Sequence, residues 1–323
     1  MGPFFRHTAV LLLIACCAPR LARAGAVLHS GDLVAVDSFH DPQPDPAVWR
    51  VDPATFDTTR IATGGLLVAP DRIAVGARGT IYVTDHVSGL VAIDASTGAS
   101  RVVLPLASFG GRIPHGVCVD PGGGLFVSAA RDPDGALLHV TIEPPSATVL
   151  AEGGGLRDVG GIAPAPGGGL YVAEGSGAAA SGSSGALLHI SLTGVQTVLW
   201  SAAPLQGPFD VAAGTDGWVW CAQWGGLSRR GGGFVRVRAD GSAAEVVAGS
   251  DRSQGLAATV LGTIYLVDCI SVSLDCYAVY RHVLRYGDPV GTRYLPIGAL
   301  AVVPDLTIPA RPSTWGALKA RYR

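Results

Sequence analysis

One short pattern, a glycine followed by β-branched and aromatic residues, recurs six times and limits the folds open to this chain. Its copies are residues 31–37, 79–85, 123–129, 168–174, 217–223 and 262–268. The first glycines of successive copies lie 48, 44, 45, 49 and 45 residues apart. A period of about 40 to 50 residues with a short strand behind a glycine turn is typical of propeller blades, which have about four strands each. The sequence therefore predicts an all-β fold, a six-bladed β-propeller of four-stranded blades over residues 25–305.

A second repeated strand precedes five of the glycine strands. Its copies are residues 70–75, 114–119, 159–163, 208–212 and 253–257. A sixth copy, residues 296–302, has no glycine strand after it, whereas the glycine strand at 31–37 has no such strand before it. We therefore predict that the C-terminal strand completes the N-terminal blade, because this closure removes the open edges of the ring.

Length and composition bound the domain number and the classes of partner. One blade cannot bury both of its faces alone, so six repeats in 323 residues predict one cooperative domain, which we expect to be a monomer. Charged residues make up only 15% of the chain and the net charge is −2, which excludes the basic surface that nucleic-acid binding needs. Beyond the first 24 residues no apolar run reaches the length of about 18 residues that a membrane span requires.

The N-terminus has the features of an export signal. A basic start and an apolar run at residues 8–17 predict a secretory signal peptide over residues 1–24, and hence a periplasmic or extracellular protein. Residues 13–16 also resemble the lipobox of bacterial lipoproteins, in which Cys16 would carry a lipid anchor. Cleavage after residue 24 and anchoring through Cys16 both remain open.

Four cysteines follow the signal. Cys269 and Cys276 bracket one loop, and we predict a disulfide between them in an oxidising compartment. Cys118 and Cys221 fall in strands of different blades, where we predict buried free thiols that pack as small hydrophobic residues.

Two segments lie outside the regular repeat. Residues 175–185 are rich in glycine and serine, and form either a flexible insertion or a lid. Residues 306–323 read as a linker and a short basic C-terminal helix, which either packs on the propeller or docks to an envelope component.

The combined pattern is Pro-x-Gly-apolar-Ala followed by Gly-x-apolar-Tyr-Val-x-Asp, over about residues 31–305. It resembles the NHL-repeat propellers and their relatives, the senescence-marker/gluconolactonase family and virginiamycin B lyase. The resemblance implies that the starts of the Pro-x-Gly strands and the ends of the glycine strands meet at one face of the central channel. We call this face the mouth, and it is where relatives bind ligands.

The x position of the Pro-x-Gly strand gives a first ring of side chains at the mouth. Its members are Asp71, His115, Gly160, Phe209, Gln254 and Ile297. The resemblance implies a divalent metal, Ca²⁺ or Mg²⁺, bound here by Asn, Asp and Glu oxygens. Asp71 and His115 are the good ligands in this chain, with Asp85 as a further candidate, and the chain has no asparagine. Hard cations take about six or more oxygen ligands, so water or other loops would have to complete such a site.

The ends of the glycine strands give a second ring. Its members are Asp37, Asp85, Ala129, Glu174, Gln223 and Asp268, with His40 and His86 close behind. An aspartate here can accept backbone N–H bonds from the adjoining turn, so we predict structural roles for the three aspartates. Glu174 and His86 are open to either role. His115 with Glu174 would suit proton abstraction from a bound ligand, which makes them the catalytic candidates.

These rings give a predicted ligand-binding set. Its members are Asp71, His86, His115, Glu174, Asp210 and Gln254. By contrast, His139 and His189 align with Arg50, Arg236 and Arg281 on the third strands, and we predict that they are ordinary strand residues with solvent-facing tips.

Two functions from different classes fit these residues. One is an exported binding module that takes a protein, peptide, glycan or small molecule at the mouth. The other is a gluconolactonase-like hydrolase or virginiamycin B lyase-like enzyme that uses His115 with Glu174, Asp71 or Asp85. The shortage of metal ligands in the first ring favours the binding module.

Overall fold

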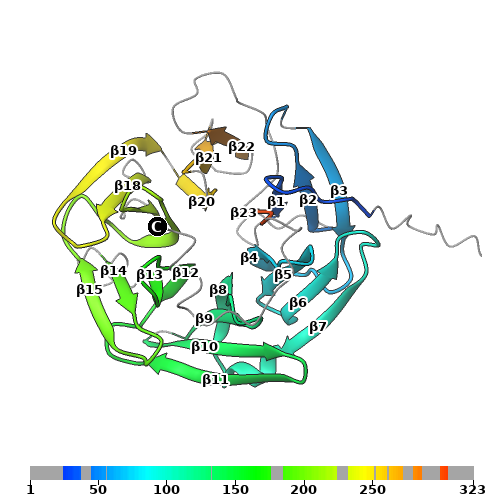
Figure 1. Cartoon of the computed structure of the whole chain (residues 1–323), viewed down its shortest axis with the longest axis horizontal. Helices are drawn as coiled ribbons and strands as arrows, with labels where there is room; N and C mark the ends of the chain where they lie inside the picture. Colours follow the sequence, from blue (N-terminus) through cyan, green and yellow to red (C-terminus); the bar gives the residue numbers. More distant parts are fainter. Residues whose placement is uncertain are drawn as a thin grey trace, which may run out of the picture.

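The computed structural model describes residues 25–37, 45–55, 57–131, 133–175, 185–223, 232–250, 252–259, 262–271, 279–285 and 299–304. Its strands form six antiparallel sheets arranged as blades around a central channel (Figure 1). In the part of the chain that the structure describes, no helix is long and apolar enough to cross a membrane.

The blades follow one another along the chain. Blade 1 contains β1 (Leu33–Val36), β2 (Ala47–Val51), β3 (Thr58–Thr63) and the C-terminal β23 (Ala299–Val302). Blade 2 contains β4 (Pro70–Val75), β5 (Thr80–Asp85), β6 (Gly89–Asp94) and β7 (Ser100–Pro105). Blade 3, reached through the 3₁₀ helix η1 (Leu106–Phe109), contains β8 (Ile113–Val119), β9 (Leu125–Arg131), β10 (Asp134–Ile142) and β11 (Pro145–Glu152).

The second half of the ring repeats this order. Blade 4 contains β12 (Val159–Pro164), β13 (Leu170–Glu174), β14 (Ala186–Ile190) and β15 (Gln196–Trp200). Blade 5 contains β16 (Pro208–Ala213), β17 (Trp218–Gln223), β18 (Gly232–Arg238) and β19 (Ala244–Ser250). Blade 6 contains β20 (Arg252–Ala258), β21 (Ile264–Ser271) and β22 (Val279–Arg285) among the described residues.

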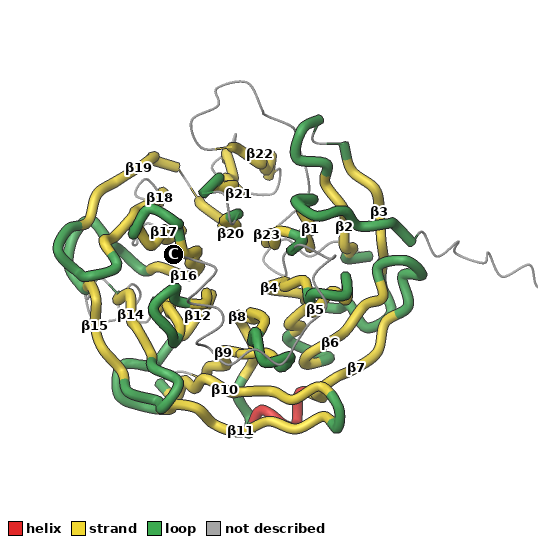
Figure 2. Tube along the Cα trace, viewed as in Figure 1, coloured by secondary structure: helices red, strands yellow, loops and turns green. Residues whose placement is uncertain are grey.

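The two ends of the chain close the ring in one blade. β23 pairs antiparallel with β1, with Leu33 opposite Val302 and Val36 opposite Ala299. β23 also contacts β20 on one side and β4 on the other, so the six inner strands form an unbroken ring around the channel (Figures 1 and 2). The predicted closure is therefore confirmed.

The hydrophobic core lies between blades rather than within them. Each of six buried clusters draws its side chains from two neighbouring blades; for example, Val34 and Val36 of blade 1 pack with Ile81 and Val83 of blade 2. Tyr82, between those two residues, faces the other way into the cluster shared with blade 3. Because successive strand residues point to opposite faces, every blade contributes to two interfaces, which makes the whole ring one cooperative unit.

The glycines of the Pro-x-Gly strands allow the inner strands to approach closely. A Cβ atom on Gly116 would lie 2.6 Å from the carbonyl oxygen of Gly160, and one on Gly160 would lie 2.3 Å from that of Phe209. Ser128 ties the same strands together, since its hydroxyl accepts a bond from Gly116 N–H and donates to Gly160 O. A side chain larger than hydrogen at Gly116 or Gly160 would therefore collide with the inner strand of the next blade.

Candidate functional site

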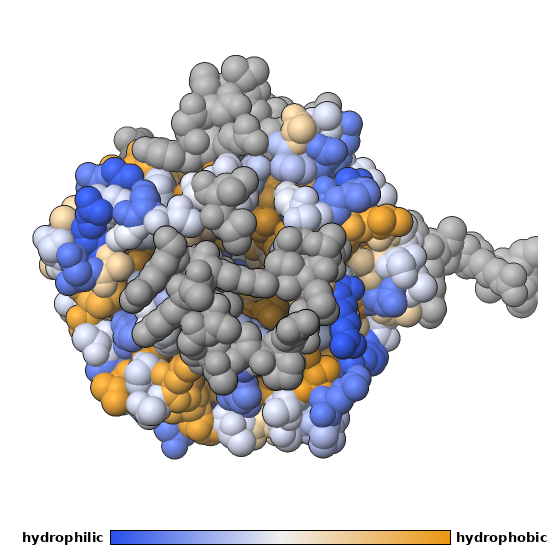
Figure 3. Space-filling model, viewed as in Figure 1, coloured by the Kyte–Doolittle hydropathy of each residue, from blue (hydrophilic) through white to orange (hydrophobic). Residues whose placement is uncertain are grey.

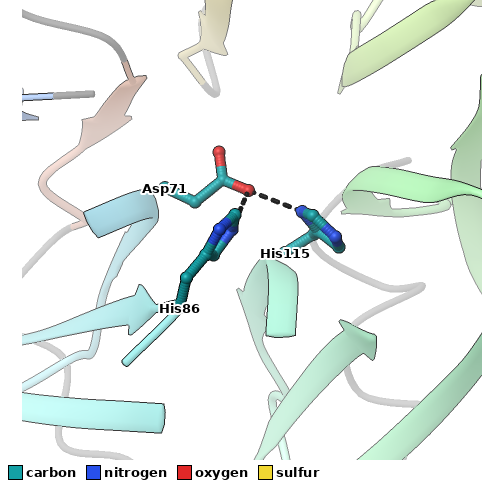
Figure 4. A group of neighbouring side chains, drawn as sticks. All are labelled: Asp71, His86 and His115. Atoms are coloured by element: carbon teal, nitrogen blue, oxygen red, sulfur yellow. Dashed lines mark hydrogen bonds and ion pairs between the residues drawn. The ribbon is translucent and has the colours of Figure 1, made fainter. Parts of the chain in front are cut away.

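The channel carries a group of three polar side chains from two neighbouring blades. We call Asp71 on β4, His86 just after β5 and His115 on β8 the mouth cluster. Figure 4 shows the three side chains pointing toward one another. His115 Nδ1 lies 2.8 Å and His86 Nε2 lies 3.2 Å from the same carboxylate oxygen, Asp71 Oδ2. The two imidazole rings meet edge to face, with their centroids 4.9 Å apart.

A β-bulge at the start of β4 and of β8 explains this placement. The pairing of β4 with β5 shifts register between Pro70 and Ile73, and that of β8 with β9 shifts between Pro114 and Val117. In a regular strand, neighbouring residues would point to opposite faces, but a bulge re-aims the side chains that it contains. Asp71 and its neighbour Arg72 are consequently both buried and bonded to each other.

Arg72 extends from the mouth cluster across the channel. One guanidinium nitrogen donates to Asp71 Oδ1 at 2.5 Å, and another donates to the carbonyl oxygen of Phe209 at 3.2 Å. Its Nε lies 3.5 Å from Asp210 Oδ1, and the guanidinium stacks 5.0 Å from the Phe209 ring centroid. Phe209 and Asp210 belong to blade 5, which faces blade 2 across the ring, so Arg72 connects opposite sides of the channel.

The charges in this network are strongly coupled. Burial alone would raise the pKa of Asp71, but the Arg72 charge and the hydrogen bonds from His115 and His86 hold it well below its ordinary value. Asp71 is therefore an ionised, acceptor-only group, and the imidazole nitrogens that face it carry the hydrogens. Burial raises the pKa of Asp210, although Arg72 and the N–H groups of Leu256 and Val211 oppose that rise.

Thr84 fixes the backbone on which His115 stands. Its hydroxyl accepts the N–H of Arg72 at 3.0 Å and donates to the carbonyl oxygen of His115. This one side chain therefore joins the inner strands of blades 2 and 3 next to the mouth cluster, which keeps Asp71 and His115 in register.

Most described members of the second ring serve the adjoining loops. Asp85 accepts the backbone N–H groups of Val68, Ala69, Val87 and Ser88 at 2.7 to 2.9 Å. Asp37 accepts the N–H of Ala47 and the indole N–H of Trp49. Gln223 accepts the N–H of Gln206 at 2.7 Å. These bonds agree with the structural roles predicted for Asp37 and Asp85. Asp85 was also a candidate metal ligand, but four backbone N–H groups already bond to its two carboxylate oxygens.

Glu174 and His115, the predicted catalytic pair, have different partners. Glu174 is buried at the end of β13 and accepts the backbone N–H of Asp158 at 3.2 Å. His115 bonds to Asp71 instead, as described above. The catalytic role of Glu174 with His115 therefore stays a prediction. Asp210, a further predicted ligand-binding residue, is buried next to Arg72.

The described thiols agree with their prediction, whereas the outer histidines are strand residues as predicted but do not have solvent-facing tips. His139 on β10 bonds to Asp120 at 2.9 Å, and His189 on β14 bonds to the carbonyl oxygen of Gly168 at 2.8 Å. Both rings are half-buried rather than fully solvent-facing. Cys118 and Cys221 are buried free thiols.

Other predictions fall outside the described residues. They concern the signal peptide and Cys16, the Gly/Ser segment, the C-terminal helix, His40, Ile297, Cys276, and the side chains of Gln254, Asp268 and Cys269.

The residues of the mouth cluster do not fit the Ca²⁺ or Mg²⁺ that the sequence resemblance implies. Such hard cations require about six or more oxygen ligands. The cluster offers one carboxylate and two imidazoles, and Arg72 already holds the second carboxylate oxygen. Gly160 and Phe209, at the next positions of the first ring, have no ligand atoms in their side chains.

Comparison with known proteins identifies the fold. No family model and no curated protein matches the sequence. Among solved structures, the nidogen chain of a nidogen/laminin complex superposes with a TM-score of 0.61 at 13% identity, covering 85% of this chain and 98% of that one. The protein is a six-bladed β-propeller.

Two enzymes share this propeller fold. A gluconolactonase from Xanthomonas campestris gives a TM-score of 0.50 at 14% identity, over 74% of this chain and 84% of that one. Virginiamycin B lyase from Staphylococcus aureus, solved with quinupristin, gives 0.51 at 12% identity, over 82% and 87%. At these identities the comparisons establish the architecture of the propeller, and its chemistry must come from its own residues.

Proposed function

We propose that the protein binds a small ligand at the mouth of its channel, with the mouth cluster as the polar part of the site. The observation that carries the proposal is the convergence of two imidazoles on one buried carboxylate. The His86 and His115 side chains keep 14% and 23% of their surface exposed, whereas Asp71 keeps 4%. A few converging polar groups in a concave site are the usual signature of ligand binding.

The surroundings of the cluster combine charged and apolar groups. Arg72, which is bonded to Asp71, spans the channel to the carbonyl oxygen of Phe209 in blade 5. Around the rim of the face in Figure 3, hydrophilic and hydrophobic residues are interspersed. Three exposed apolar residues lie close to the cluster along the chain: Val68, three residues before Asp71, Val87, next to His86, and Ile113, two residues before His115. A ligand with a polar group toward the imidazoles and an apolar body against these side chains fits this arrangement.

The same cluster supports a second candidate function, turnover of the bound ligand. An imidazole held by an ionised carboxylate is the arrangement that general acid–base catalysis uses, since the carboxylate orients the ring and stabilises its protonated form. His115 has this partner in Asp71. The likeness to a lactonase and a lyase supports the two reaction classes to examine, ring opening of a lactone and elimination.

Binding and turnover can be measured with the same two probes, glucono-1,5-lactone and quinupristin. We expect one of them to raise the midpoint of thermal unfolding of the wild type, and we expect His115→Ala to abolish that rise. His139→Ala is the matched control, because His139 also bonds to an aspartate but stands on the outer strand β10. Product formation, followed by mass spectrometry, would favour the enzyme over the binding module.

The outcome that would refute the site is specific. An equal response to the probe in wild type and His115→Ala would place binding elsewhere on the ring. A response to peptides or oligosaccharides that depends on His115, with no turnover, would support the wider binding-module function, for which the propeller of nidogen, solved in complex with laminin, is a precedent.

We also propose that the protein acts outside the cytoplasm, which rests on the signal-like N-terminus. The mass of the mature protein from fractionated cells checks this. A chain that starts at residue 25 would support secretion, and one that starts at an acylated Cys16 would support a lipoprotein.

A further inference from the structure

We propose that the mouth cluster binds a first-row transition-metal dication of the Zn²⁺ type, through Asp71, His86 and His115, instead of Ca²⁺ or Mg²⁺. The inference rests on the site of the proposed function but not on the identity of the ligand. It follows from the disagreement between the hard, oxygen-ligated cation implied by the sequence resemblance and the donors that the channel presents.

The geometry of the cluster is close to that of a bound metal. One ligand atom from each of the three residues lies within 4.8 Å of the others. Asp71 Oδ2 is 3.2 Å from His86 Nε2 and 2.8 Å from His115 Nδ1. Ligand atoms at about 2.0 to 2.2 Å from a tetrahedral Zn²⁺ are about 3.3 to 3.6 Å apart. The distance from Asp71 Oδ2 to His86 Nε2 therefore needs to open by about 0.1 to 0.4 Å, and that to His115 Nδ1 by about 0.5 to 0.8 Å, to admit the ion.

The donor types select the metal. Two imidazoles and one carboxylate suit Zn²⁺ and its first-row neighbours, whereas Ca²⁺ and Mg²⁺ prefer carboxylate, carbonyl and water oxygens. Three protein ligands with a further position open are also typical of Zn²⁺ sites that interact with substrates. Because both imidazoles keep part of their surface exposed, the open position would face the mouth, where the ligand of the proposed function enters.

Arg72 gives the carboxylate the orientation that such a site needs. It holds Asp71 Oδ1, which leaves Oδ2 as a single metal-facing oxygen. Bonds of this kind to the far side of a ligand commonly orient it and raise metal affinity. The guanidinium also lies beside Asp210, so its positive charge is shared between two carboxyl groups and its repulsion of a bound cation is reduced.

The protons balance when the metal binds. In the metal-free protein, His115 Nδ1 and His86 Nε2 carry the hydrogens that bond to Asp71. When the metal takes these nitrogens, each neutral imidazole carries its hydrogen on the other ring nitrogen, and no proton is released.

Metal titration of the full chain, freed of metal by a chelator, tests the inference. We expect the wild type and His139→Ala to bind one Zn²⁺ at the cluster, measured by competition with a chromophoric chelator, and to give Co²⁺ absorption bands typical of nitrogen and oxygen ligands. Loss of one ligand in His86→Ala or His115→Ala should weaken this binding by about 100-fold or more. Millimolar Ca²⁺ or Mg²⁺ should not compete.

A second variant separates folding from metal binding. His115→Gln keeps a donor that can reach Asp71 but removes the imidazole, so its circular dichroism should match the wild type while its Zn²⁺ affinity falls. Unchanged Zn²⁺ affinity in His86→Ala, His115→Ala and His115→Gln, no Zn²⁺ binding in the wild type, or equal affinity for Ca²⁺ would each overturn the inference. Repeating the probe measurements without metal distinguishes the two proposals, because a His115-dependent response in metal-free protein would uphold the ligand site even if Zn²⁺ does not bind.

Discussion

Arg72→Met is the substitution that best tests the cross-channel network, because it keeps most of the side-chain volume and removes the charge. In the wild type, Arg72 is 7% exposed and bonds to Asp71 in blade 2 and to Phe209 in blade 5. The variant would leave the Asp71 carboxylate buried with only the two imidazoles as partners. We expect a large loss of stability, since breaking a buried ion pair from one side leaves an uncompensated charge.

The expected loss at pH 7 is about 3 to 5 kcal/mol in the free energy of unfolding. For a domain of this size it corresponds to a fall of roughly 6 to 20 °C in the unfolding midpoint. Arg101→Met is the control. Arg101 lies 3.9 Å from Glu143, and their side chains are 52% and 85% exposed, so we expect a change of about 0 to 1 kcal/mol.

The loss of stability in Arg72→Met should depend on pH. Asp71 has a depressed pKa in the wild type, so it contributes stability above the ordinary carboxyl pKa of 3.8 and loses that contribution as the pH falls through its folded value. Loss of Arg72 removes the largest of the influences that lower the pKa of Asp71, so this pKa rises and the buried carboxylate destabilises the variant most at neutral pH. The stability gap between wild type and variant should therefore shrink from pH 7 toward pH 4.

Urea unfolding followed by tryptophan fluorescence at pH 7, 5.5 and 4 measures this gap. A loss below about 1 kcal/mol at pH 7 would show that Arg72 is not part of a coupled buried network. A gap that widens as the pH falls would refute the assignment of Asp71 as the ionised partner.

Three further predictions concern the ring itself. Gly160→Ala should destabilise the protein by about 1 to 3 kcal/mol, because its Cβ would lie 2.3 Å from the Phe209 carbonyl oxygen; thermal unfolding checks this. Cys118 and Cys221 should react with a thiol reagent only after denaturation, since both are buried and burial raises the pKa of each thiol; labelling in native buffer would contradict this. Deletion of β23 (Ala299–Val302) should prevent cooperative folding, because β1 would lose its inner partner; a truncated chain that unfolds at the full-length midpoint would refute the closure argument.

The repeat predicted the ring because each blade repeats the same local signals. The glycine turn, the alternating strand and the unpaired strands at the two ends are all local, and blade number and closure follow from counting them. The first-ring position also placed Asp71 and His115 at equivalent places on adjacent blades, as candidate ligands, and the structure shows them bonded to each other. His86 was open to either role, and the structure brings it to the same carboxylate oxygen.

Arg72 was missed because two non-local facts place it. One is the bulge between Pro70 and Ile73, which lets two consecutive side chains turn into the channel, against the alternation that a strand pattern assumes. The other is the spacing of three blades between β4 and β16, which brings residues 72 and 210 together across the ring. The signal in the sequence was the charged pair Arg72 and Asp210, which stand where the other four copies of the Pro-x-Gly strand have glycine.

The division of the two Asp71 oxygens between different partners would let the cluster bind the proposed ligand without losing its own stability. Oδ1 is bonded to Arg72, while Oδ2 receives both imidazoles. An imidazole that turns toward a ligand or a metal gives up a hydrogen bond to Oδ2, which would leave most buried carboxylates short of partners. Here the guanidinium keeps its bond to the carboxylate, so the histidines are the exchangeable partners and Arg72 the permanent one. On this argument Arg72→Met should damage both folding and binding, whereas His115→Ala should damage binding far more than folding.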